Sequence, residues 1–125
     1  MFAVSGWQDS YSRNVLPLLE GLSAPKKALI GPWAHGWPHM AAPGPAIGFL
    51  QEALRWWDHW LKGRDNGIMD EPMLRVWMND WVRPAKTVKQ WPGRWVAENV
   101  WPPQAREPLV LPLSDAGLAE GKKAK

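Results

Sequence analysis

The sequence predicts an α/β fold in which a short parallel sheet is followed by the first strands of a β-sandwich. Two unbroken apolar runs, residues 1–4 and 28–30, have the pattern of strands buried on both faces of a parallel sheet. A stripe of apolar residues at helical spacing separates them, so the three segments form a predicted βαβ crossover. After Gly67 the pattern changes to short strands between loops that carry Pro, Gly and charged residues, which is typical of an all-β unit.

The helix between the two predicted strands begins near Asn14. Four apolar residues then recur at i, i+3, i+4 and i+7, on one helix face: Val15, Leu18, Leu19 and Leu22. Pro17 fits a helix only in its first turn, which agrees with this start. Gly21 and the pair Ala24-Pro25 end the helix.

A second helix is predicted over residues 49–62, after a Pro- and Gly-rich loop at 36–48. Its broad apolar face consists of Phe49, Ala53, Trp56, Trp57 and Trp60. Asp58 and Lys62 form an i,i+4 pair on the solvent side, and Gly63 is a suitable end.

Three further strands are predicted at residues 73–78, 94–96 and 109–113. They are too few to close a sandwich, so the second unit is expected to be truncated. We place the domain boundary near residues 65–71, giving one unit at 1–66 and another at 67–118. Residues 119–125 are expected to be a disordered basic tail.

Composition excludes several classes of function. The chain has no cysteine, so disulfides and thiolate metal sites are excluded. The three lysines of the final GKKAK account for the net charge of +3, and no basic stripe remains, so no nucleic-acid partner is expected. No apolar run approaches the roughly 20 residues that span a bilayer, and no membrane partner is expected. No signal-peptide pattern opens the sequence, which favours a cytoplasmic location without fixing it.

Tryptophan is unusually frequent, with 11 residues in a chain of 125. Each buried Trp removes roughly 150–250 Å² from water, and so short a chain would have difficulty burying all of them. This predicts a partner surface or additional sequence beyond these residues.

Two loops and one helix carry a resemblance to a known family. Residues 6–11, GWQDSY, and 31–36, GPWAHG, resemble the acid and histidine loops of the cocaine esterase and X-prolyl dipeptidyl aminopeptidase-like serine hydrolases. The Trp-rich helix resembles the last helix of that family's hydrolase domain. Residues 73–78 and 101–103 resemble the opening of its C-terminal jelly-roll domain. The resemblance covers residues 1–118 and implies that 1–66 are the C-terminal part of an α/β-hydrolase domain and 67–118 the beginning of a jelly-roll.

The resemblance implies that Asp9 is the acid and His35 the base of a catalytic triad. Both are expected in loops that leave the carboxyl ends of adjacent parallel strands, where open α/β sheets keep their active sites. The order of acid and then histidine fits the α/β-hydrolase sequence. Taken alone, an Asp in this position is usually a turn or helix-capping residue, and a histidine such as His35 is more often a loop residue bonded to backbone.

The nucleophile of such a triad is not found in these residues. None of the five serines, Ser5, Ser10, Ser12, Ser23 and Ser114, lies in a G-x-S-x-G frame. We expect the nucleophile upstream of Met1, in a missing N-terminal part of the hydrolase domain, so the chain alone is predicted to be inactive. The family implies ester, amide or X-Pro peptide substrates and no cofactor, and homo-oligomers are common in such families.

Trp33 and Trp37 flank His35 and either wall a substrate pocket or belong to the core. A metal pair of His35 and His39 needs a helix, which Gly36 and Pro38 disfavour, so no metal is predicted. His59 and Asp58 are expected to be structural. The alternative to a hydrolase is a non-catalytic binding module, or a pseudoenzyme remnant, that uses its Trp-rich faces to hold a partner.

Overall fold

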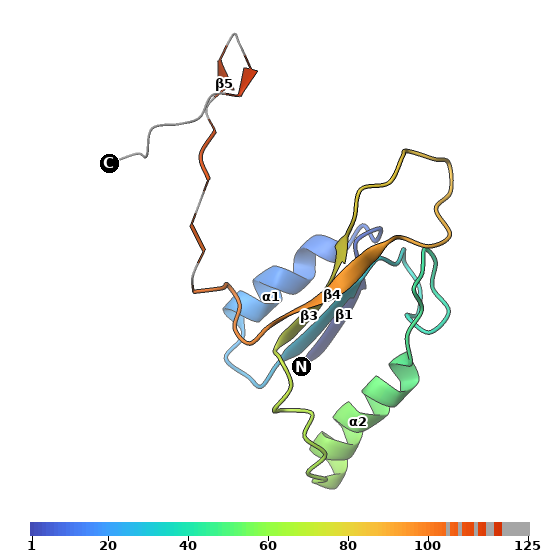
Figure 1. Ribbon diagram of the computed structural model, residues 1–125. Coiled ribbons are helices and arrows are strands. Elements are labelled where there is room, and N and C mark those ends of the chain that lie inside the picture. The colour runs from blue at the N-terminus through green and yellow to red at the C-terminus, as the bar shows by residue number, and fades with distance from the viewer. Residues whose placement is uncertain (105, 108, 112, 115–116, 119–125) are drawn as a thin grey trace.

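The computed structural model describes residues 1–104, 106–107, 109–111, 113–114 and 117–118. Within them, one four-stranded sheet of order β1-β2-β3-β4 lies between two helices (Figure 1). The elements are β1 (Phe2–Gly6), a 3₁₀ turn (Ser12–Asn14), α1 (Val15–Gly21), β2 (Lys27–Gly31), α2 (Phe49–Lys62), β3 (Leu74–Asn79) and β4 (Gly93–Glu98). Two very short strands, β5 (Leu113–Ser114) and β6 (Gly117–Leu118), form a separate hairpin.

The predicted βαβ crossover is present. β1 and β2 pair in parallel, in register from Phe2 with Lys27 to Gly6 with Gly31, and α1 connects them. Both helices begin where the sequence predicts, and α2 ends at Gly63, whose φ of 63° needs a residue without a Cβ. The α/β class is therefore confirmed for this part of the chain.

The sheet assignment of residues 73–78 differs from the prediction and is a correction. We expected these residues and 94–96 to begin a separate β-sandwich. Instead β3 pairs in parallel with β2, and β4 pairs antiparallel with β3, which makes one mixed sheet. The physical reason is that every residue of β2 is buried, so its second edge needs a partner for its backbone groups. The division into two domains stays a prediction.

The predicted strand at 109–113 was wrong for its first three residues. Of the described residues in this segment, 109–111 are in no strand, and Leu113 is the first residue of β5. Leu109 is 82% exposed and Val110 64%, so no strand among the described residues covers this apolar run. The predicted tail at 119–125 lies outside the described residues.

Alternate residues of β2 face two separate cores. Ala28 and Ile30 pack with Val15 and Leu19 of α1, and Leu74 of β3 completes this layer. On the other face, Leu29 packs with Trp33 and with Phe49 of α2. This period-2 alternation places α1 and α2 on opposite sides of the sheet, as Figure 1 shows.

The edge of β1 has no strand beside it among the described residues. A cleft of about 520 Å³ runs along β1 and the neighbouring face of α2, and Trp57 and Trp60 in its wall are half-exposed. The expectation that this chain does not bury all its tryptophans is met at this edge. Neither helix described here has the length and apolar character needed to cross a bilayer.

Two glycines allow the carboxyl ends of β1 and β2 to approach. Trp33 is 1% exposed and lies directly over Gly31, where a Cβ would come within 2.5 Å of three ring atoms. A Cβ on Gly6 would lie 2.0 Å from the carbonyl oxygen of Trp33. The indole is further held by its Nε1, which donates to the carbonyl of Pro45 over 2.7 Å.

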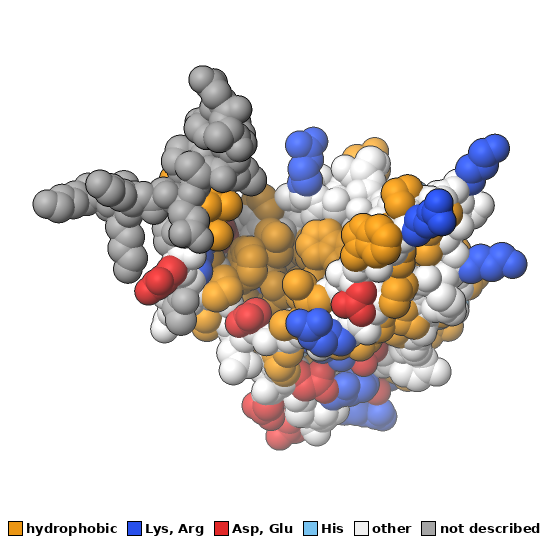
Figure 2. Space-filling model, turned by 45° about the horizontal axis from the view of Figure 1, so that its top comes forward, with side chains coloured by type: hydrophobic (Ala, Val, Ile, Leu, Met, Phe, Trp, Pro, Cys, Tyr) orange, Lys and Arg blue, Asp and Glu red, His pale blue; other side chains and the backbone are white. Residues whose placement is uncertain are grey.

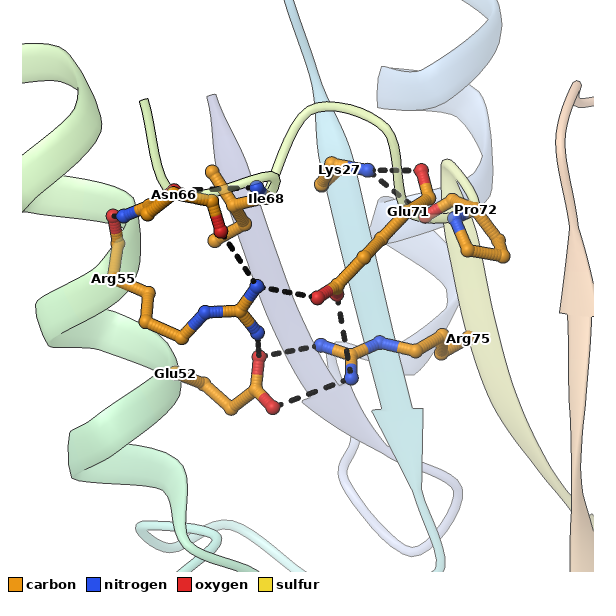
Figure 3. Close-up of polar contacts among 8 residues, drawn as sticks. All are labelled: Lys27, Glu52, Arg55, Asn66, Ile68, Glu71, Pro72 and Arg75. Atoms are coloured by element: carbon orange, nitrogen blue, oxygen red, sulfur yellow. Dashed lines mark hydrogen bonds and ion pairs between the residues drawn. The ribbon is translucent and has the colours of Figure 1, made fainter. Parts of the chain in front are cut away.

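An ionic network joins α2 to β3 and to the segment between them (Figure 3). Arg75 of β3 donates two hydrogen bonds to Glu52 of α2, at 2.7 and 3.3 Å. Arg55 donates to Glu71 over 2.5 Å, and Lys27 of β2 donates to the backbone carbonyls of Glu71 and Pro72. The hydrogen bonds from Arg75 hold the pKa of Glu52 below its ordinary value, and burial lowers the pKa of Lys27.

We expect Gly31→Ala to lower the free energy of unfolding by about 1–3 kcal/mol or more, because the added methyl group overlaps the Trp33 ring. Gly21→Ala is the matched control: no atom lies within 4 Å of its added Cβ, and alanine favours the helix. Urea unfolding of the two variants tests this. Equal stability of the two would contradict the packing described at Gly31.

We expect Glu52→Gln to lower the free energy of unfolding at pH 7 by about 1–3 kcal/mol, since Arg75 loses its charged acceptor. The pKa of Glu52 is depressed in the folded state, so its contribution is complete above the unfolded-state pKa and is lost as pH falls through the folded-state pKa. The difference between wild type and variant should therefore narrow on acidification. Glu20→Gln, at an exposed position on α1, is the control and should show little change.

Candidate active site

The loops that follow β1 and β2 are joined beyond the ends of the strands. The backbone N–H of Trp7 donates to the carbonyl of Gly31 over 2.9 Å, and that of Gln8 donates to the carbonyl of Trp33 over 3.0 Å. These two bonds continue the β1–β2 pairing by one step on each side. They place Asp9 opposite His35.

The structure brings the two predicted site residues together. Oδ2 of Asp9 lies 3.0 Å from Nδ1 of His35. The Asp9 side chain is 12% exposed, whereas that of His35 is 77% exposed. An ionised carboxylate accepts only, so in the neutral imidazole this contact places the proton on Nδ1 and leaves Nε2 as the acceptor. This is the tautomer that a general base needs.

The Asp9 carboxylate is held by its own loop. Its Oδ1 accepts a hydrogen bond from the backbone N–H of Tyr11 over 2.9 Å, an Asx turn. This bond is the main cause that lowers the pKa of Asp9; burial opposes it, and the bond and charge of His35 add to it. The two oxygens are thus divided, one toward the loop backbone and the other toward the imidazole.

Tyr11 is a residue of the site that the sequence alone did not indicate. Its ring lies 5.8 Å from the His35 ring between centroids, at 57°. The signal in the sequence is its position two residues after Asp9, because in an Asx turn the backbone N–H of that residue donates to the Asp side chain. Nothing in that spacing predicts the contact of its side chain with the imidazole.

A cleft of about 450 Å³ opens at these residues and contains both predicted aromatic neighbours of His35. Trp33 is buried, so it belongs to the core and also contributes to the floor of the cleft. Trp37 is 61% exposed and stacks on Phe49, with ring centroids 6.1 Å apart. Both tryptophans therefore line the cleft, and Trp33 is in addition a residue of the hydrophobic core.

No serine of the described side chains hydrogen-bonds to His35. Ser5 lines the same cleft, but its Oγ is buried and has no hydrogen-bond partner among the described residues.

His39 stacks on Phe49 rather than approaching His35. Nδ1 of His59 donates to the carbonyl of Arg64 over 3.1 Å, and Asp58 pairs with Lys62 at 2.6 Å. In the part of the chain described, no three His, Cys, Asp or Glu side chains gather into a metal-binding group.

No family model matches this sequence. Two curated mycobacterial proteins are similar to it, both carrying the name "Putative serine esterase", one from Mycobacterium bovis and one from Mycobacterium tuberculosis. Each is 32% identical over 112 residues, an alignment that covers 84% of this chain. The chain spans only 16% of the length of these relatives. The similarity supports a relationship to serine-esterase-type hydrolases at this general level.

We expect the pKa of Asp9, measured by the carboxyl ¹³C shift, to lie below the ordinary aspartate value. His35→Ala should return it only part of the way, because the Tyr11 N–H remains as the main stabilising donor. His59→Ala, which removes a histidine bonded elsewhere, should leave it unchanged. A full return to the ordinary value in His35→Ala would show that the Asx turn does not hold the carboxylate.

Proposed function

We propose that Asp9 and His35 are the acid and base of the catalytic triad of a serine hydrolase that cleaves esters or amides. The observation that carries this proposal is the 3.0 Å contact between Oδ2 of Asp9 and Nδ1 of His35, where two neighbouring parallel strands end. The similarity to the two proteins named as serine esterases supports the same class. The acid and histidine loops support the cocaine esterase and X-prolyl dipeptidyl aminopeptidase-like family within it.

In this mechanism Nε2 of His35 takes the proton of a serine hydroxyl as that oxygen attacks the substrate carbonyl. The imidazolium then protonates the departing alcohol or amine, which leaves an acyl-serine. Water, deprotonated by the same Nε2, hydrolyses the acyl-serine and regenerates the enzyme. Asp9 stays ionised throughout, holds the tautomer and stabilises the imidazolium.

The serine and the donors for the oxyanion would come from outside these 125 residues. The free edge of β1 and the apolar cleft along α2 support this, because a further strand placed there would extend the sheet and cover exposed tryptophans. Residues 1–66 would then be the last part of an α/β-hydrolase sheet. The β3–β4 hairpin would connect that sheet to a following jelly-roll.

The test is acyl hydrolysis with p-nitrophenyl esters and an X-Pro-arylamide. We expect the 125 residues alone to give no rate above background, since loss of the nucleophile of a triad costs on the order of 10⁶ in turnover. Expressed together with the coding sequence that precedes them, they should be active; Asp9→Asn should then lower kcat by about 10⁴ and His35→Ala by about 10⁶.

His59→Ala is the matched histidine control and should keep the wild-type rate, because His59 lies near the end of α2 and bonds to the carbonyl of Arg64. If the longer protein is active and His35→Ala leaves its rate unchanged, the proposed base is wrong. A longer protein that folds but has no hydrolase activity would favour the binding-module alternative.

A further inference from the structure

Trp7, two residues before Asp9, bonds to the ends of two different strands. It directly follows β1, and its backbone N–H donates to the carbonyl of Gly31, the last residue of β2, over 2.9 Å. Its indole Nε1 donates to the carbonyl of Trp77 of β3 over 2.6 Å. Because β2 lies between β1 and β3 in the sheet, the indole bond reaches across the end of β2. The acid loop is thus fastened to all three parallel strands.

The indole bond lies where the pairing of β2 with β3 ends. The last pair of these two strands joins Ile30 to Val76, and Trp77 is the next residue of β3. From Trp77 onward β3 continues beside β4 alone, as far as Asn79. At this point a side-chain hydrogen bond from the acid loop takes the place of the strand pairing.

The histidine loop contacts the same β3–β4 hairpin through aromatic rings. The ring of Trp33 lies 6.2 Å from that of Trp95 of β4 between centroids, and Trp95 meets Trp77 edge to face at 5.3 Å. Figure 2, which brings the upper side of Figure 1 forward, shows hydrophobic side chains gathered across the middle of the visible face. Both loops of the candidate site therefore rest on one hairpin, the acid loop by a hydrogen bond and the histidine loop by ring packing.

The direction of the Asp9 side chain depends on how its loop is held. The backbone N–H of Gln8 donates to the carbonyl of Trp33 over 3.0 Å, which joins the acid loop to the histidine loop. Without the indole bond of Trp7 to β3, the acid loop could rotate about these backbone bonds to the chain around β2. Because a hydrogen bond weakens steeply as its angle departs from linearity, a modest rotation would weaken the contact of Asp9 with His35.

We propose that Trp7 is a positioning residue of the candidate site: its indole bond to β3 fixes the acid loop, so that Asp9 holds the neutral imidazole of His35 in the tautomer with its proton on Nδ1. The effect on catalysis rests on the proposed function, whereas the effect on the tautomer rests on the contacts alone. Tryptophan suits this place because it combines a ring long enough to reach across β2 with an N–H donor. Phenylalanine has a ring and no donor.

The test is the tautomer of His35, read from the imidazole ¹⁵N shifts of the 125-residue chain at a pH where the ring is neutral; His35→Ala identifies its signals. Wild type should show mainly the Nδ1–H form. Trp7→Phe should lower the ratio of the Nδ1–H to the Nε2–H form about threefold or more, because one hydrogen bond that holds the loop is lost. Trp91→Phe is the matched control: it removes an indole bond of 3.0 Å to the carbonyl of Asp80, at the base of the β3–β4 loop, and should leave the ratio as in wild type.

Hydrogen exchange of the indole N–H in the unsubstituted chain gives a second measurement that needs no variant. The Trp7 indole proton should exchange with solvent more slowly than that of Trp81, which is exposed. Equally fast exchange of the two protons would overturn the proposal. An unchanged tautomer in Trp7→Phe, or an equal change in Trp91→Phe, would do the same, with cooperative urea unfolding showing that each variant is folded.

In the longer protein that includes the preceding coding sequence, Trp7→Phe should lower kcat about three- to tenfold and change KM less than about twofold. The reason is that the base is misoriented while no contact to substrate is lost, since Trp7 is not among the described residues that line the cleft of Asp9 and His35. If hydrolysis proves independent of His35 while Trp7→Phe still shifts the tautomer, the proposed function fails and the positioning role stands. Hydrolysis that needs His35, with tautomer and kcat unchanged in Trp7→Phe, gives the reverse.

Discussion

The close approach of β1 and β2 at their carboxyl ends is the constraint on which the rest of the structure depends. A side chain at Gly6 would meet the backbone of Trp33, and one at Gly31 would meet its indole. With both positions free, the loops continue the strand pairing through Gln8 and hold Asp9 opposite His35. The site geometry is therefore a consequence of packing under Trp33, and the exposed imidazole itself contributes little to it.

Much of this arrangement could be predicted from the sequence because it is local. The apolar runs, the helical spacing after Asn14 and the chain order of strand, helix and strand place Asp9 and His35 at one sheet edge. The pairing of β3 with β2 could not be predicted, since an alternating strand pattern shows which face is buried and not which neighbour it joins. The ring of Tyr11 against His35 likewise depends on a side-chain direction that no spacing encodes.

The side chains of Asp9 and His35 differ in their exposure to solvent, and this difference bears on the chemistry that the pair could support. Asp9 is mostly covered and keeps its charge, so the orientation of the imidazole is prepared in advance. His35 is largely open to water, where charge developing in a transition state would be stabilised by solvent rather than by fixed dipoles. The proposed role of His35 as a base thus calls for a further surface over it, and the apolar groove beside β1 is the adjoining region that such a surface would also cover.

Stability and the candidate site draw on different side chains. The network of Glu52, Arg75, Arg55 and Glu71 fastens α2 to β3, and none of its members lines the cleft that contains Asp9 and His35. Among the described residues that line this cleft, by contrast, the contact of Asp9 with His35 is the one ion pair. The charges that fasten α2 and the charges of the site are therefore separate sets, so loss of a contact in one set removes no contact of the other.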